Sequence, residues 1–148
     1  MKRDFWEGKR VLVTGYEGFL GSWLTRFLLE RRAQVAGLDI RVRRKETILT
    51  RDEVRKVSIF KGSVEDAKLI ERILLTRRIE FIFHLAAWAI VGECLRKPAL
   101  AISANVRGTW NMLEAARNNT MIKGLVIASS DKAYGSHTDL PYKEDYSL

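Results

Sequence analysis

The sequence RVLVTGYEGFLG, residues 10–21, places a short apolar run directly before three evenly spaced glycines. The run is rich in β-branched residues, which is typical of a buried strand. We expect Gly15 to form a tight turn, Gly18 to let a pyrophosphate approach the backbone, and Gly21 to let the following helix pack closely on the strand. A helix that begins here offers free N–H groups and partial positive charge to phosphates. The stretch therefore predicts a strand, a phosphate-binding loop and a helix.

Strand-like and helix-like patterns alternate along the rest of the chain. Further strands are predicted at residues 34–39, 57–61, 81–85 and 125–128, and helices at 19–31, 66–76 and 98–118. The alternation predicts a parallel sheet covered on both faces, and right-handed crossovers give the doubly wound strand order 3-2-1-4-5. We therefore predict an α/β Rossmann fold of five strands that ends before a sixth.

Two predictions concern which side chains point inward. In the helix at 19–31, helical spacing predicts one apolar side made of Leu20, Leu24, Phe27 and Leu28. In the strand at 57–61, we expect Val57 and Ile59 to point inward, and Ser58 and Phe60 to point outward or to lie against a helix.

Length and composition are those of one globular domain. The chain has 148 residues, of which 47% are hydrophobic and 30% charged. Ten glycines, two prolines and one cysteine exclude a collagen-like polymer and a disulfide scaffold. Cys94 has no second cysteine to pair with, residues 1–7 contain no apolar signal core, and the longest near-apolar stretch, 81–92, is shorter than the roughly 20 residues that span a bilayer. We expect a cytoplasmic protein with no membrane partner.

The net charge of +8 raises the question of an anionic partner. Arg41, Arg43, Arg44 and Lys45 lie together, and a solvated basic loop explains such a run as well as a ligand does. No aromatic residues are interleaved with these charges, so we expect no nucleic-acid partner. No cluster of His, Cys, Asp and Glu has the spacing of a metal site, so we expect no metal.

An acidic residue follows the second predicted strand. Asp39 stands 18 residues after Gly21, where a carboxylate accepts hydrogen bonds from the hydroxyls of an adenosine ribose. A carboxylate there repels a 2′-phosphate, so Asp39 favours NAD over NADP. Arg41, Arg43 and Arg44 stand nearby, and because arginine is the usual partner of a 2′-phosphate, they favour NADP instead.

The glycine spacing G-x-x-G-x-x-G resembles that of the short-chain dehydrogenase/reductase superfamily. Three later segments are similar to its extended branch, the NAD-dependent sugar-nucleotide epimerases and dehydratases. They are His84-Leu85-Ala86-Ala87, Asn105-Val106-Arg107-Gly108-Thr109 and Ser129-Ser130-Asp131-Lys132-Ala133-Tyr134-Gly135. The pair Asp131-Lys132 and the phrase at residues 18–24 look most like the sugar-nucleotide 4,6-dehydratases, the CDP-glucose 4,6-dehydratases in particular.

The resemblance implies cofactor-binding roles for several residues. The N–H groups of Phe19 and Leu20 would lie against the pyrophosphate. Ser63 and Val64 would lie around the adenine, although Ser63 stands where the family has an acid. The remaining implied residues are Leu85, Ala86 and Ala87, which would line the cofactor groove, and Asn105, which would support the active-site network.

The resemblance also implies a reaction on a nucleotide sugar. One sugar carbon is oxidised by hydride transfer to the nicotinamide, and a dehydratase, which is a lyase, then eliminates water. Ser130 would hydrogen-bond the sugar hydroxyl and Asp131 would act as the acid, while Lys132 stands where related dehydratases have a glutamate base. The helix at residues 98–118, from Pro98 to Asn118, is a candidate homodimer face through Trp110, Met112 and Leu113, with core packing as an equal explanation.

The superfamily's catalytic pair, a tyrosine with a lysine four positions later, does not occur in residues 1–148. We therefore expect residues 1–148 to be an incomplete dinucleotide-binding domain without the C-terminal substrate part. Such a chain would bind cofactor without turnover. The alternative is a non-catalytic dinucleotide-binding module that regulates a partner or senses redox state.

Overall fold

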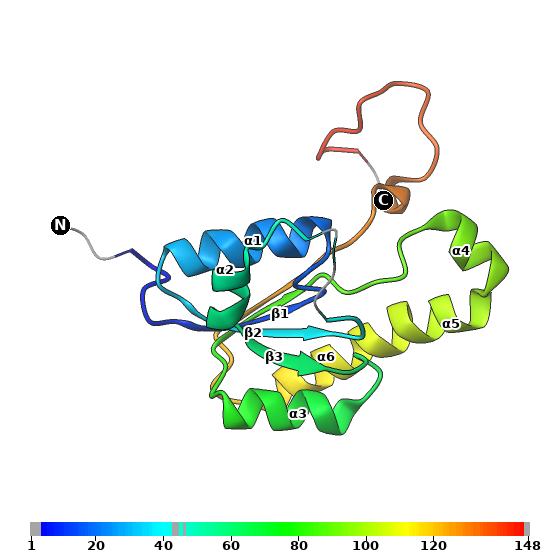
Figure 1. Ribbon diagram of the computed structural model, residues 1–148. Coiled ribbons are helices and arrows are strands. Elements are labelled where there is room, and N and C mark those ends of the chain that lie inside the picture. The colour runs from blue at the N-terminus through cyan, green and yellow to red at the C-terminus, as the bar shows by residue number, and fades with distance from the viewer. Residues whose placement is uncertain (1–3, 43–44, 46, 147–148) are drawn as a thin grey trace.

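One five-stranded parallel sheet forms the centre of the computed structural model, which describes residues 4–42, 45 and 47–146 (Figure 1). The strand order β3-β2-β1-β4-β5 confirms the predicted order. Arg43 and Arg44 of the basic run lie outside the described residues. The strands are β1 Arg10–Thr14, β2 Gln34–Asp39, β3 Ser58–Lys61, β4 Phe81–His84 and β5 Gly124–Ile127. The helices are α1 Phe19–Glu30, α2 Arg51–Lys56, α3 Ala67–Thr76, α4 Val91–Arg96, α5 Pro98–Ile102, a π-helix Ser103–Arg107, α6 Gly108–Arg117 and a 3₁₀-helix Asp131–Tyr134.

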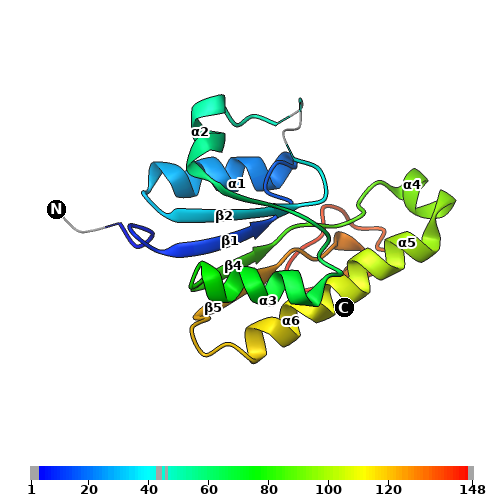
Figure 2. The same ribbon diagram turned by 60° about the horizontal axis from the view of Figure 1, so that its bottom comes forward.

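Helices cover both faces of the sheet, with α1 and α2 on one face and α3 and α6 on the other (Figures 1 and 2). Alternate residues of β1 serve the two layers, because successive side chains of a strand point to opposite faces. Val11 and Val13 pack toward Leu28 of α1, and Leu12 packs toward Ile70 of α3. Both faces of β1 are therefore buried, as its continuous apolar run predicts.

The buried side of α1 differs from the predicted one. Its buried residues are Gly21, Ser22, Thr25 and Leu28, whereas Leu20 and Phe27 are exposed. The prediction is therefore wrong for Leu20 and Phe27. The physical reason is the close approach of α1 to the loop before it, since a Cβ on Gly21 would overlap the carbonyl oxygen of Gly15. The small residues Gly21, Ser22 and Thr25 therefore lie on the buried side of α1, and Leu20 lies on the exposed side.

The prediction for the strand at 57–61 is confirmed for Val57, which is buried, and for Phe60, which lies on the side of a helix, but not for Ile59. Ile59 is exposed, while Phe60 packs against the core on the α3 side. The guanidinium of Arg77, which follows α3, lies 5.5 Å from the Phe60 ring centroid. Ile59 belongs to neither core cluster on this edge strand, so the prediction for Ile59 is wrong.

The predicted helix at 98–118 is present, but it is interrupted. A π-helical turn, Ser103–Arg107, separates α5 from α6, and α6 ends at Arg117 with Asn118 as its C-cap. Such turns occur mostly as local insertions and frequently lie at functional sites. None of the helices in the described part of the chain is long and apolar enough to cross a membrane.

Candidate functional site

A groove of about 370 Å³ lies at the carboxyl ends of β1, β2 and β4. The lining comes from residues 15, 18–20, 38–40, 62–65, 85–89 and 104. Strand β1 pairs with β2 on one side and β4 on the other, so the chain order reverses at this point of the sheet. In open α/β sheets, ligands bind at such a switch point. The groove is therefore the candidate site.

The glycine loop forms the inner wall of the groove. Gly15 has a φ of +68°, and a Cβ there would lie 3.1 Å from the backbone of Ala86, so a side chain is disfavoured on both counts. The N–H of Gly18 donates to the carbonyl of Gly15 at 2.9 Å, which closes the turn. These two residues bring bare backbone to the groove.

The first turn of α1 faces the groove. Gly18 is the N-cap and provides no side-chain cap, and Phe19 and Leu20, which line the groove, are 88% and 58% exposed. The first N–H groups of a helix have no intrahelical acceptor and carry partial positive charge. No acidic residue stands in this first turn. The arrangement suits an anion such as a pyrophosphate.

Asp39 lies at the end of β2 and is 4% exposed, with its side chain in the groove wall. Its Oδ1 accepts the backbone N–H of Arg41 at 3.0 Å, and its backbone carbonyl accepts the N–H of Gly62 at 3.0 Å. The second contact ties the end of β2 to the end of β3. A carboxylate in this place can accept hydrogen bonds from ligand hydroxyls.

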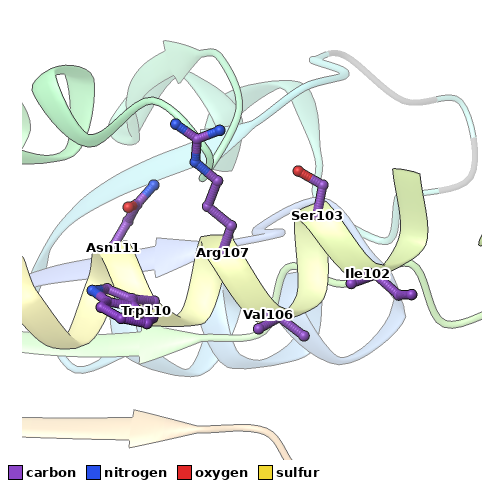
Figure 3. Close-up of a pocket in the computed structure, with 6 residues that line it drawn as sticks. All are labelled: Ile102, Ser103, Val106, Arg107, Trp110 and Asn111. Carbon is purple, nitrogen blue, oxygen red and sulfur yellow. The ribbon is translucent and has the colours of Figure 1, made fainter. Parts of the chain in front are cut away.

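The segment 62–65 forms the outer end of the groove and is fastened to the long helix. The side-chain amide of Asn111 donates to the backbone carbonyls of Val64 and Glu65 at 3.1 and 2.9 Å. A Cβ on Gly108 would lie 2.5 Å from Cγ2 of Val64, so glycine permits this close approach. Figure 3 shows Ser103, Arg107 and Asn111 extending from one side of the helix.

Asn105 and Gly21 act from outside the groove lining. Oδ1 of Asn105 accepts the N–H of Trp88 at 2.8 Å, and its Nδ2 donates to the carbonyl of Trp88 at 3.0 Å. The pair of bonds fixes the backbone of a lining residue. Gly21 lies against Gly15 and supports the loop from behind. The other ten residues predicted to contact the cofactor line the groove: Gly15, Gly18, Phe19, Leu20, Asp39, Ser63, Val64, Leu85, Ala86 and Ala87.

Ser130, Asp131 and Lys132 follow β5 and are exposed. Ser130 caps the 3₁₀-helix by accepting the N–H of Lys132 at 3.2 Å, and its hydroxyl donates to Oδ1 of Asp131 at 3.2 Å. The ammonium of Lys132 lies 3.5 Å from Oδ2 of Asp131. The three side chains thus form one polar cluster, and none of them is part of the groove lining.

Several lining residues were not predicted from the sequence: Leu38, Ile40, Gly62, Glu65, Trp88, Ala89 and Ala104. Most adjoin predicted residues, so extending each segment by one or two positions would have found them. Ala104 reaches the groove from the π-helix, for which the sequence gives no periodic signal. In the described residues no group of three or more His, Cys, Asp and Glu side chains is placed to hold a metal ion.

A family model described as GDP-mannose 4,6 dehydratase matches residues 12–148. CDP-glucose 4,6-dehydratase of Salmonella typhimurium is 33% identical over 136 residues, and UDP-glucose 4-epimerase of Lactobacillus helveticus is 32% identical over 139. These alignments cover 89% and 94% of this chain.

A solved structure, UDP-glucose 4-epimerase from Bifidobacterium longum in complex with NAD⁺ and UDP, superimposes with a TM-score of 0.82 at 28% identity over 94% of this chain. The chain spans 37% and 41% of the two curated relatives' lengths and 42% of the Bifidobacterium chain. It therefore corresponds to about two fifths of these proteins.

Proposed function

The chain belongs to the GDP-mannose 4,6 dehydratase family, within the extended short-chain dehydrogenases/reductases, and from this premise we propose that it is the NAD-binding portion of a sugar-nucleotide 4,6-dehydratase or epimerase. The family membership confirms the resemblance carried by the sequence motifs. The relatives named above include both reaction classes, a dehydratase and an epimerase. Asp131-Lys132 favours the dehydratase.

One observation carries the proposal: the groove combines bare backbone, a helix N-terminus and an acidic strand end. The loop at Gly15 and Gly18 gives the pyrophosphate access to the first N–H groups of α1. Asp39 lies at the end of the neighbouring strand, where a ribose attached to that pyrophosphate extends. Phosphate site and diol acceptor are thus arranged along one groove, in the order of an adenine dinucleotide.

The acid at the ribose position supports NAD rather than NADP. Asp39 is buried in the groove wall, and a carboxylate there would repel the 2′-phosphate of NADP. Its contact with the Arg41 backbone N–H orients the carboxylate. Bound NAD would accept a hydride from the sugar carbon in the reaction of the whole enzyme.

The polar cluster after β5 is proposed to act on the sugar. Ser130 would donate a hydrogen bond to the sugar hydroxyl that is oxidised, and Asp131 would protonate the leaving hydroxyl in a dehydratase. Lys132, paired with Asp131 at 3.5 Å, would have to lose a proton before it could act as a base. No tyrosine in residues 1–148 has a lysine four positions later. We therefore expect this chain to bind cofactor without turnover.

The row of apolar side chains that runs along the long helix beside Ser103 and Asn111 is proposed as a homodimer face. Ile102, Val106 and Trp110 lie together in that row (Figure 3), and all three are exposed. Leu113 extends the apolar strip by one turn, whereas Met112 is buried in the core, so the prediction that it faces a partner is wrong. A contiguous apolar strip on one helix can pack against its own copy about a two-fold axis. A second copy of this chain is the occupant we propose.

Isothermal titration calorimetry of the 148-residue chain with NAD, NADP and a nucleotide sugar tests the function. We expect saturable binding of NAD, weaker binding of NADP, and no conversion of the sugar. Failure of both dinucleotides to bind would contradict the proposal. Turnover of a nucleotide sugar by this chain would contradict the expectation that it binds cofactor without catalysing the reaction.

A further inference from the structure

Glu65, at the outer end of the groove, has no part in the function proposed so far. It lines the groove beside Ser63 and Val64, just past the end of β3. Because β3 is the outer neighbour of β2, this end lies beyond Asp39, and the Gly62 N–H bond to the Asp39 carbonyl joins the two places. A base attached to a ribose at Asp39 would extend toward Glu65.

Two hydroxyls hold the carboxylate of Glu65. Ser63 Oγ donates to Oε2 at 3.0 Å, and Ser103 of the π-helix donates to Oε1. Figure 3 shows the Ser103 side chain on the side of the helix that also carries Asn111, and Asn111 fixes the backbone carbonyl of Glu65. Side chain and backbone of Glu65 are both oriented by the long helix.

The side chains of Ser63 and Glu65 leave only hydrogen-bond acceptors for a ligand. The Ser63 hydroxyl gives its one proton to Oε2 of Glu65 and accepts the Glu65 backbone N–H at 3.1 Å. Ser63 therefore has no proton left for a ligand. An ionised carboxylate offers about four lone-pair sites, and the two hydroxyls use two of them. This end of the groove can accept hydrogen bonds but, through these side chains, does not donate them.

We infer that Glu65, held by Ser63 and Ser103, selects a base with an exocyclic amine, as in adenine, at the outer end of the groove. The inference rests on the proposed dinucleotide function and deepens it. An amine donates two hydrogen bonds and suits a carboxylate, whereas a ring carbonyl in the same place meets it with repelling lone pairs. Ser63, which the sequence resemblance placed against the adenine, acts by positioning Glu65.

The direct test compares NAD with nicotinamide hypoxanthine dinucleotide, in which a carbonyl replaces the adenine amine. Both are titrated into the wild-type 148-residue chain by calorimetry. We expect the hypoxanthine dinucleotide to bind at least about tenfold more weakly. Equal affinities overturn the inference and leave the proposed function standing. Binding of neither dinucleotide contradicts the proposed function and this inference with it.

Variants assign the discrimination to Glu65. In Glu65→Gln, the side-chain amide can present either its oxygen or its nitrogen to the base, so we expect the ratio of the two dissociation constants to fall to within about threefold. The matched control is Glu71→Gln, on the exposed side of α3, which should keep the wild-type ratio. Ser103→Ala leaves the carboxylate but removes one hydroxyl that orients it, so its ratio should lie between the two.

The competing explanation is that Glu65 and Ser103 only tie the loop at 62–65 to the long helix, and it predicts a different result. Glu65→Gln and Ser103→Ala would then lower the melting temperature but leave the ratio of dissociation constants unchanged. That outcome overturns the inference. If Glu65→Gln does not fold, the wild-type ratio and Ser103→Ala decide.

Discussion

The hydroxyl of Thr14 and the ring of His84 form a buried pair beneath the groove, with Oγ1 2.8 Å from Nδ1. Thr14 Oγ1 also accepts the backbone N–H groups of Leu85 and Ala86, each at 3.1 Å. These donors use both lone pairs of the hydroxyl, so its proton points to Nδ1 of His84. The ring is then the Nε2–H tautomer, with Nε2 3.3 Å from the hydroxyl of Thr109. The Thr14 hydroxyl thus holds the backbone of Leu85 and Ala86, two residues that line the groove.

Thr14→Val tests the weight of this hydroxyl. Valine keeps the shape but leaves two backbone N–H groups and Nδ1 of His84 without their partner. Buried polar groups left unsatisfied cost about 1–3 kcal/mol each, so we expect the free energy of unfolding in urea to fall by about 3 kcal/mol. Thr14→Ser, which retains the hydroxyl, should lose less than about 1 kcal/mol. Equal stabilities of the two variants would show that the hydroxyl is not the cause.

The pH dependence of stability follows from the burial of His84. Burial lowers the pKa of His84 below its ordinary 6.5, so the unfolded chain takes up a proton first as the pH falls. The contribution of the neutral ring is complete above pH 6.5 and is lost as the pH falls from there toward the folded-state pKa. We expect the free energy of unfolding to decrease as the pH falls through about 6.5 toward the folded-state pKa of His84.

Urea denaturation at a series of pH values measures this decrease. The described carboxyl groups with lowered pKa are Glu53, Glu80 and Glu114, with an ordinary value of 4.5, so their contributions are lost at more acidic pH. His84→Asn should flatten the profile in this pH range. If the free energy of unfolding of His84→Asn still decreases as steeply with falling pH, a group other than His84 causes the decrease.

The strand positions and the glycine loop could be predicted because both depend on local signals, and the rule of right-handed crossovers then gave the strand order. A β-branched apolar run indicates a strand wherever it stands, and Gly15 indicates a backbone conformation that other residues avoid. Asp39 could be predicted because the end of a parallel strand fixes the place of its side chain. Each of these residues reaches the groove through its own element.

The features of the site that could not be predicted from the sequence depend on packing between elements. Glu65 enters the groove because Ser103 and Asn111, about 40 residues later in the chain, hold its segment. The π-helix that carries Ser103 adds a residue to a turn, which sequence periodicity does not indicate. Leu20 was assigned to the wrong side of α1 because the close contact of Gly21 with Gly15 decides how the helix is rotated.

Gly18→Val tests the phosphate loop. Gly18 has a φ of −69° and ψ of 175°, which valine can adopt, and its Cβ would lie 3.1 Å from the Gly15 carbonyl oxygen. The fold should survive, but the branched side chain would occupy the path of a phosphate to α1. We expect the NAD dissociation constant to rise at least about 100-fold by calorimetry. Gly92→Val, where a Cβ meets nothing within 4 Å, is the control, and retained affinity in Gly18→Val would contradict the loop's assignment.

Asp39→Asn tests the discrimination between the two dinucleotides. Asparagine keeps an oxygen for the Arg41 N–H but removes the charge that repels a 2′-phosphate. We expect NAD to bind about tenfold more weakly and NADP more tightly, so that the ratio of their dissociation constants shrinks. Asp52→Asn, on the exposed α2, should leave the ratio as in the wild type. An unchanged ratio in Asp39→Asn would mean that another group reads the ribose.

Trp110→Glu tests the homodimer face. Trp110 is 67% exposed on α6, beside Val106 of the preceding turn, so a charge there would be buried against the second copy without a partner. We expect sedimentation velocity to show a dimer for the wild type and a monomer for the variant. Trp23→Glu is the matched control, because Trp23 is 52% exposed on α1, which covers the opposite face of the sheet. A monomeric wild type would contradict the proposed homodimer. Dissociation in Trp23→Glu but not in Trp110→Glu would mean that the interface does not lie on the long helix.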